Sequence, residues 1–393
     1  MATARPAGLT ELARFGFEDL TGAISGLERL VEALGDLGHT CLAHLGRAQN
    51  PDQALRHLIR FASENKSLTR QVLRNEESAA RLILILGASD ALADFLHRQP
   101  NAIQWLENRH AQLVGQESMA SVIRDRVKPQ LIANSEIADA WTALRIAYRE
   151  QLLRVAAFDL QQSQPVANLP KIAAELADLA GAALEVALEI ARFELGTRPD
   201  FGRFEPTELA ATELAVIGMG KAGARELNYI SDVDVIFVAE SSSAELDSQR
   251  AVEIATKLAT RMMRAIDGTA AEPALWQVDA NLRPEGKSGA LVRTLESHLS
   301  YYDRWAESWE FQALLKARPL AGNFDLGERY ATALAPKVWS SSKRDGFVES
   351  VQKMRQRVTD NIPTTEVDRQ IKLGPGGLRD VEFTVQLLQI VHG

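Results

Sequence analysis

Two carboxylates, Asp232 and Asp234, open a run that is otherwise apolar and β-branched, Val-Asp-Val-Ile-Phe at residues 233–237. This run begins soon after a glycine-rich turn, Gly-Met-Gly-Lys-Ala-Gly at residues 218–223. Alternate side chains of a strand share one face, so the two carboxylates point the same way. Like charges buried side by side are unfavourable unless a cation neutralises them. The pattern therefore predicts a divalent metal, and the turn predicts a phosphate for that metal to hold.

A third carboxylate, Asp279, lies in residues 276–282, which have the pattern of another strand. Beside the first two, it would complete a cage for two metal ions, which binds nucleotide phosphates and stabilises both the attacking and the leaving oxygen. Carboxylate ligands suit Mg²⁺. Surface strands also carry an Asp-x-Asp pair without a metal. The prediction therefore rests on the glycine-rich turn, the Asp-x-Asp pair and the later strand aspartate taken together. We predict that Asp232, Asp234 and Asp279 are catalytic ligands of Mg²⁺.

The turn has a rival interpretation, because Gly218, Gly220 and Gly223 match G-x-G-x-x-G, the fingerprint of dinucleotide-binding Rossmann domains. Only seven residues separate Gly223 from Ser231. A right-handed parallel crossover needs about a dozen or more, whereas seven allow a short turn of helix and then a neighbouring strand. The Rossmann interpretation also leaves the aspartates unexplained, and it stays the minority alternative.

A loop rich in polar residues follows the Asp279 strand. Its Arg283, Lys287 and Ser288 are candidates for binding phosphate oxygens, with a plain polar hairpin as the alternative. The roles of four further cations stay open at this point: Lys316, Arg318, Lys372 and Arg379.

Charge and composition exclude several classes of protein. The 393 residues are enough for two or three domains, and the net charge of −8 argues against broad nucleic-acid binding. Cys41 is the single cysteine, which excludes an intrachain disulfide and a multi-cysteine zinc site, and the seven histidines show no metal-ligand spacing. There is no signal-peptide pattern and no apolar run of about 18 residues. We predict a cytoplasmic protein without nucleic-acid or membrane partners.

The pattern changes along the chain from helical to mixed. Residues 1–165 show apolar spacings of three and four, with breaks near Pro51, Pro100 and Pro165. A strong helix is expected at 171–195, directly after Pro170. Strands are predicted at 214–217, 233–238, 276–282 and 290–293, and further helices at 244–266, 325–334 and 346–358.

Several blocks in order resemble the nucleotidyltransferase superfamily typified by DNA polymerase β, and more narrowly the bifunctional glutamine synthetase adenylyltransferase/adenylyl-removing enzymes. The blocks are residues 218–221, 226–228, 231–234, 282–289, 316–318 and 371–383. The resemblance is strong over about residues 200–393, and in the N-terminal helices it is mainly one of general residue pattern. It implies an α+β fold: a polymerase β-like core with a small mixed sheet at 166–335, an N-terminal helical region at 1–165, and a helical segment at 336–393 that we expect to be truncated.

This family carries two nucleotidyltransferase halves. The N-terminal half removes AMP from a tyrosine of glutamine synthetase by phosphorolysis, giving ADP, and the C-terminal half attaches AMP from ATP. The motif Glu-Leu-Asn at 226–228 resembles the corresponding motif of the N-terminal half. The resemblance thus implies an Mg²⁺-dependent enzyme of nitrogen metabolism with glutamine synthetase, the PII signal protein, phosphate, ADP and ATP as partners. It also implies phosphate contacts by Gly218, Gly220, Lys221 and Ser231.

Two other functions stay open on the sequence alone. One is a catalytically silent module that docks glutamine synthetase or PII, although three intact candidate ligands argue against it. The other is a nucleotidyltransferase that acts on a small molecule or on another protein.

Overall fold

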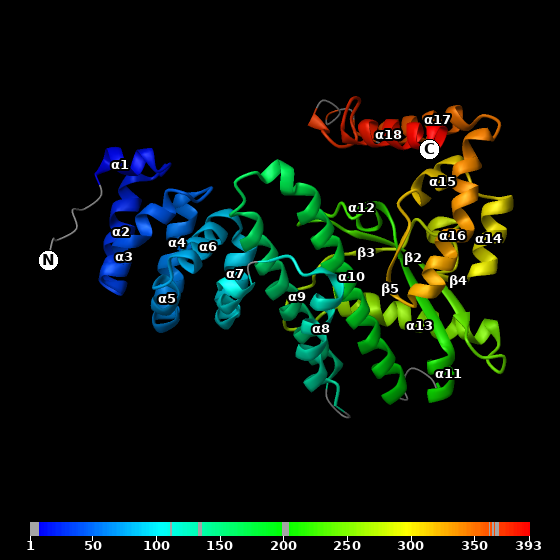
Figure 1. The fold of residues 1–393 in the computed structure, drawn as a ribbon, viewed down its shortest axis with the longest axis horizontal. Helices are drawn as coiled ribbons and strands as arrows, with labels where there is room; N and C mark the ends of the chain where they lie inside the picture. Colours follow the sequence, from blue (N-terminus) through cyan, green and yellow to red (C-terminus); the bar gives the residue numbers. More distant parts are fainter. Residues whose placement is uncertain are drawn as a thin grey trace. The chain divides into compact units, whose positions relative to one another are not determined.

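The computed structural model (Figure 1) describes residues 8–110, 112–132, 136–198, 204–360, 362–363, 365 and 369–393. The chain forms two compact units, each described by itself below. Unit 1 comprises Met1–Ile123 and Arg145–Leu179, and unit 2 comprises Arg124–Leu144 and Ala180–Gly393. The predicted three-part division at residues 165 and 335 stays a prediction.

Unit 1 is helical. Its helices begin at polar caps: the side chains of Asn50, Asn75 and Ser89 each accept a hydrogen bond from the backbone of the first helical turn that follows. Their apolar faces form one core, which includes Leu58, Phe61, Leu82 and Phe95. The helices are α1 (Leu9–Arg14), α2 (Leu20–Leu34), α3 (Asp36–Leu45), α4 (Pro51–Glu64), α5 (Lys66–Leu73), α6 (Glu76–Ala88), α7 (Asp90–Arg98) and α8 (Gly115–Val127), the last of which ends in unit 2.

Two long helices, α9 (Ile137–Asp159) and α10 (Pro165–Thr197), contribute residues to both units. The breaks predicted near Pro51, Pro100 and Pro165 are confirmed. The predicted start of the next helix after Pro170 is wrong, because α10 begins at Pro165 and contains Pro170. Pro170 is the sixth residue of α10, so its missing N–H leaves the carbonyl of Val166 without its intrahelical donor. Val166 is 84% exposed, so water can bind that carbonyl instead.

Unit 2 contains a mixed sheet in the order β3-β2-β1-β5, with β4 also paired to β2. Strand β1 is antiparallel to both β2 and β5, whereas β3 and β4 run parallel to β2. The antiparallel β1–β2 pair contradicts the Rossmann alternative, which requires a parallel crossover. The strands are β1 (Thr212–Gly218), β2 (Val233–Ser241), β3 (Val278–Asp279), β4 (Val292–Thr294) and β5 (Arg318–Gly322).

Helices cover the sheet on both faces, so the central strands are buried almost throughout. Ile217 and Ile236 pack with Tyr302 and Tyr330 of α14 and α16, while α13 packs against β1, β2 and β4. The helices of this unit include α11 (Pro206–Ala211), α12 (Gly220–Gly223), α13 (Ser248–Asp267), α14 (Leu295–Arg304), α15 (Ser308–Leu314), α16 (Phe324–Ser340), α17 (Phe347–Asp360) and α18 (Leu378–His392). The predicted α+β class is confirmed.

Two strands differ from their predictions. β5 was not predicted, because Pro319 lies within it; β5 is the terminal strand in the sheet order, where a proline is tolerated. β3 is two residues long instead of seven, since the Asp279 side chain accepts a hydrogen bond from the backbone N–H of Asn281 and turns the chain. None of the described helices has the length and apolarity needed to cross a membrane.

Candidate active site

The three predicted aspartates meet at one end of the β2–β3 pair. Asp232 directly precedes β2, Asp234 is its second residue, and Asp279 ends β3 opposite Asp234 in the parallel ladder. One carboxylate oxygen from each lies within 4.8 Å of the others. Asp232 is exposed, and the other two are half-buried. The sequence pattern had placed the first two together, and the ladder adds the third.

Electrostatic repulsion within this cluster is visible at Asp234. Its burial, followed by the charges of Asp232 and Asp279, raises the pKa of Asp234 to about 6. Two cations, Lys221 and Arg379, act in the opposite direction. A carboxylate cluster of this kind attracts positive charge, and three carboxylate oxygens within 4.8 Å of one another could hold a metal ion such as Mg²⁺.

The glycine-rich turn is fixed against the same aspartates. The Met219 backbone N–H donates to the carbonyl oxygen of Asp234 at 2.8 Å. Gly220 has φ +51°, and a Cβ added there would lie 2.4 Å from Oδ2 of Asp234. Only glycine therefore allows the turn to pass so close to the carboxylate. The turn continues directly into the short helix α12.

Two residues after α15 hold this turn from outside. The Arg318 guanidinium donates to the carbonyl oxygens of Ala222 and Gly223, both at 3.1 Å. A Cβ on Gly223 would lie 1.9 Å from the carbonyl oxygen of Lys316. Arg318 therefore binds the C-terminal end of α12, where orphan carbonyls need donors. Its role, which the sequence left open, is to support the turn.

Lys221 lies in the turn, within α12, and Ser231 lies at the end of the connection from the turn to β2. The Lys221 ammonium donates to the side-chain oxygen of Asn228 at 2.9 Å, and Asn228 in turn donates to the carbonyl oxygen of Ile230. The Ser231 hydroxyl donates to Oδ1 of Asp232 at 3.3 Å. Asn228 thus positions Lys221 beside the cluster. The resemblance of residues 226–228 to the family did not predict this role of Asn228.

The loop after β3 is built around Arg283. Its guanidinium donates to the carbonyl oxygens of Ala280, Lys287 and Gly289 at 2.8–3.1 Å. Arg283 therefore uses several of its donors to shape the loop, a contribution that the sequence did not predict. The same hydrogen bonds hold in place the segment that carries Lys287 and Ser288.

Helix α18 reaches the turn through Lys316. The Lys316 ammonium pairs with Glu226 at 3.2 Å and with Glu382 at 2.8 Å. Burial alone would raise the pKa of Glu382, but this ammonium holds it below its usual value. Arg379, one turn earlier on α18, stacks over Phe383, and its Nε is buried without a hydrogen-bond partner among the described residues. The partners of Lys316 are too distant in sequence to be predicted.

Comparison with known proteins identifies a family whose matched region contains this site. The family model for glutamate-ammonia ligase adenylyltransferase matches residues 79–333, which include all three aspartates. The model for GlnD PII-uridylyltransferase matches residues 348–393.

Three curated relatives share the name bifunctional glutamine synthetase adenylyltransferase/adenylyl-removing enzyme. The relative from Leifsonia xyli is 52% identical over 388 residues, covering 98% of this chain and 38% of the relative. Those from Streptomyces avermitilis and Mycobacterium avium are 46% and 43% identical, covering 99% and 100% of this chain and 37% of each relative. The chain thus spans less than two fifths of the length of these relatives. The extent of these matches shows that the chain belongs to the glutamate-ammonia ligase adenylyltransferase family.

Proposed function

We propose that this chain is the adenylyl-removing part of a bifunctional glutamine synthetase adenylyltransferase/adenylyl-removing enzyme. The observation that carries the proposal is the convergence of Asp232, Asp234 and Asp279 beside a glycine turn. A protein that only docks a partner has no need for three repelling carboxylates, since they lower its stability. The names of the relatives and the block at residues 226–228 support the choice of reaction.

The reaction is phosphorolysis of the bond between AMP and a tyrosine of glutamine synthetase. An oxygen of inorganic phosphate forms a bond to the AMP phosphorus, the bond to the tyrosine oxygen breaks, and ADP is released. The tyrosine oxygen takes its proton from solvent. No protein base is required, because inorganic phosphate is already an anion at neutral pH.

The three aspartates would hold Mg²⁺. When bound, the metal supplies charge neutralisation for the phosphates and for the developing tyrosinate. The backbone of Gly218 and Gly220 would form a cradle for the phosphates, meaning the space beside the turn. A side chain at either glycine would crowd its neighbours.

Cationic and hydroxyl groups of the chain orient the phosphates around this cradle. Lys221, positioned by Asn228, faces the cluster from the turn, and Ser231 adds a hydroxyl. Arg283 holds the loop from which Lys287 and Ser288 would reach phosphate oxygens. Arg379 would approach from α18, since its charge already acts on Asp234.

Phosphate-dependent ADP release tests the proposal. The chain is incubated with adenylylated glutamine synthetase, Mg²⁺ and phosphate, beside Asp232→Asn and the exposed control Asp345→Asn. We expect ADP from the wild type and the control only. Mg²⁺-dependent nucleotide binding without ADP would favour a docking module, and normal activity in Asp232→Asn would contradict the metal site. PII binding and a cytoplasmic location stay predictions from the sequence.

A further inference from the structure

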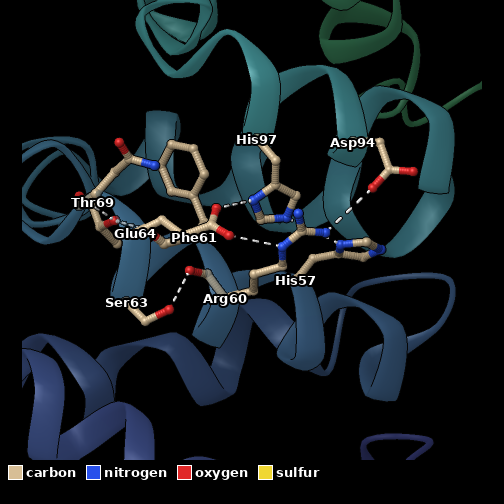
Figure 2. Close-up of polar contacts among 9 residues, drawn as sticks. His57, Arg60, Phe61, Ser63, Glu64, Thr69, Asp94 and His97 are labelled. Atoms are coloured by element: carbon tan, nitrogen blue, oxygen red, sulfur yellow. Dashed lines mark hydrogen bonds and ion pairs between the residues drawn. The ribbon is translucent and has the colours of Figure 1, made fainter.

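A second cluster of ligating side chains lies within unit 1, between α4 and α7. His57 of α4 and His97 of α7 face each other, with Nδ1 of His57 3.4 Å from Nε2 of His97. The other nitrogen of each ring contacts a carboxylate: Nε2 of His57 lies 2.8 Å from Asp90, and Nδ1 of His97 lies 2.8 Å from Glu64. Figure 2 shows the two rings and Glu64.

The hydrogen bonds determine which ring nitrogens carry protons. A neutral imidazole has one N–H, and an ionised carboxylate can only accept. With both rings neutral, these contacts assign the protons to Nε2 of His57 and Nδ1 of His97, facing Asp90 and Glu64. The two nitrogens that face each other then both present lone pairs. Because lone pairs at 3.4 Å repel, the arrangement calls for a cation between them.

The distance favours a metal ion over a shared proton. N–H···O hydrogen bonds in proteins normally span about 2.7–3.2 Å, and the 3.4 Å between the two ring nitrogens is at the long end of hydrogen-bond distances. An ion about 2.0–2.1 Å from each nitrogen would have a nitrogen–metal–nitrogen angle of about 110°, close to the tetrahedral value that zinc prefers. A carboxylate on the far nitrogen of each histidine is the usual companion of such ligands, because it fixes the tautomer and orients the ring.

The surrounding charges also favour a dication. Arg60 pairs with Glu64 at 3.0 Å and approaches Asp94 at 3.6 Å (Figure 2). Glu64, Asp94 and Asp90 therefore border the histidine pair with three negative charges, while Arg60 contributes one positive charge. With neutral imidazoles this set has a net charge of −2, which a divalent ion cancels and a single proton does not.

We propose that His57 and His97 bind one divalent transition-metal ion of the zinc class. The two imidazoles are the protein ligands, and Asp90 and Glu64 hold them in position. The side chains of His57 and His97 are 14% and 3% exposed and that of Asp90 is 71% exposed, so the site lies just below the surface. Nitrogen ligands distinguish this site from the aspartate cluster, which suits Mg²⁺. The bound ion joins α4 to α7 and stabilises unit 1.

Cobalt absorption tests the site, because Co²⁺ held tetrahedrally by nitrogen absorbs visible light much more strongly than octahedral Co²⁺ bound by oxygen. The whole chain is titrated with Co²⁺ in an excess of Mg²⁺, and Zn²⁺ is then added in competition. We expect one equivalent of tetrahedral Co²⁺, displaced by Zn²⁺. Absorption that is absent, or that survives in His57→Gln or His97→Gln, overturns the proposal.

Matched variants keep the test independent of folding. His39→Gln removes an exposed histidine of α3 and is expected to leave Co²⁺ binding unchanged. Asp90→Asn retains the shape of the orienting side chain but not its charge, so we expect binding weakened about 10- to 100-fold with an unaltered circular dichroism spectrum. Unchanged affinity in Asp90→Asn, or a loss of binding in His39→Gln, would contradict the assigned ligands.

Discussion

One buried ion pair of unit 1 and the aspartate cluster of unit 2 carry their charges in opposite ways. In unit 1, Arg154 and Glu175 are 2% and 5% exposed and pair at 2.8 Å. Glu175 also accepts hydrogen bonds from the backbone N–H groups of Val114 and Gly115. In unit 2, Asp232, Asp234 and Asp279 converge, and burial of Asp234, followed by the charges of the other two aspartates, raises its pKa to about 6.

The difference separates a structural use of charge from a functional one. Each charge of the Arg154–Glu175 pair is satisfied within the protein, so the pair fixes the local structure and has little capacity left for a ligand. The carboxylate cluster keeps repulsion that its neighbours do not fully offset, which lowers the stability of the protein, and on the proposed function a cation would relieve it. Four predictions sharpen this contrast, beginning with the largest expected effect.

Asp279→Asn is expected to reduce phosphorolysis by at least about 1000-fold, or roughly 4 kcal/mol in the activation barrier. Asparagine retains the oxygen that accepts from the Asn281 N–H, so β3 keeps its end while the cluster loses a charge. ADP release per enzyme measures the effect, beside Asp345→Asn. More than a tenth of wild-type activity would show that Asp279 does not act together with Asp232 and Asp234.

Arg154→Met should lower the free energy of unfolding of unit 1 by about 3–5 kcal/mol, because it leaves the Glu175 carboxylate buried without its counter-charge. Urea unfolding followed by circular dichroism measures this change. The control is Arg109→Met in the same unit, which removes an exposed pair with Glu107 and is expected to cost at most about 1 kcal/mol. Equal losses in the two variants would remove the distinction between buried and surface pairs.

Gly220→Ala is expected to lower stability by about 2 kcal/mol and to reduce phosphorolysis at least about 10-fold, since the new Cβ would meet the Asp234 carboxylate at 2.4 Å. Gly346→Ala is the matched control. Gly346 also has a positive φ, +70°, but no atom lies within 4 Å of the added Cβ. The difference between the two variants isolates the contact with Asp234 from the backbone strain. If the two variants behave alike, the turn is not shaped by the carboxylate.

The part of the site that the sequence predicts is the part that is local along the chain. Asp234 lies on β2 and Asp232 directly before it, and alternate residues share a face. The spacing to Gly223 is too short for a parallel crossover, which the antiparallel β1–β2 pair confirms. The position of Asp279 was predicted from a seven-residue strand that proved to be two residues long, yet the ladder still places it opposite Asp234.

The remainder depends on partners far apart in the sequence. Arg318 supports a turn 95 residues before it, and Lys316 contacts Glu382 66 residues later. His57 and His97 are 40 residues apart on two helices, so no ligand spacing is visible in the sequence. Such contacts are set by helix packing and by sheet order, which local periodicity does not determine.

Asp234→Asn is expected to increase stability in the absence of metal, by about 1 kcal/mol at pH 8. The folded chain raises the pKa of Asp234 from 3.8 to about 6, so the protonated carboxyl favours the folded state. That contribution is fully present below about pH 4 and is lost as the pH rises through about 6, above which the folded state holds an unfavourable charge. The magnitude allows for the partial exposure of the side chain.

Urea unfolding of both proteins at pH 4 and pH 8 tests this sign. The gain in Asp234→Asn should appear at pH 8 and vanish at pH 4, where the wild-type carboxyl is mostly protonated in the folded state. Added Mg²⁺ should stabilise the wild type at pH 8 and reduce or reverse the advantage of the variant, because the ion neutralises the repulsion that the asparagine removes. The exposed control Asp345→Asn should show neither effect. A gain of equal size at both pH values would mean that side-chain packing, and not repulsion among the three aspartates, distinguishes the site from the paired charges of unit 1.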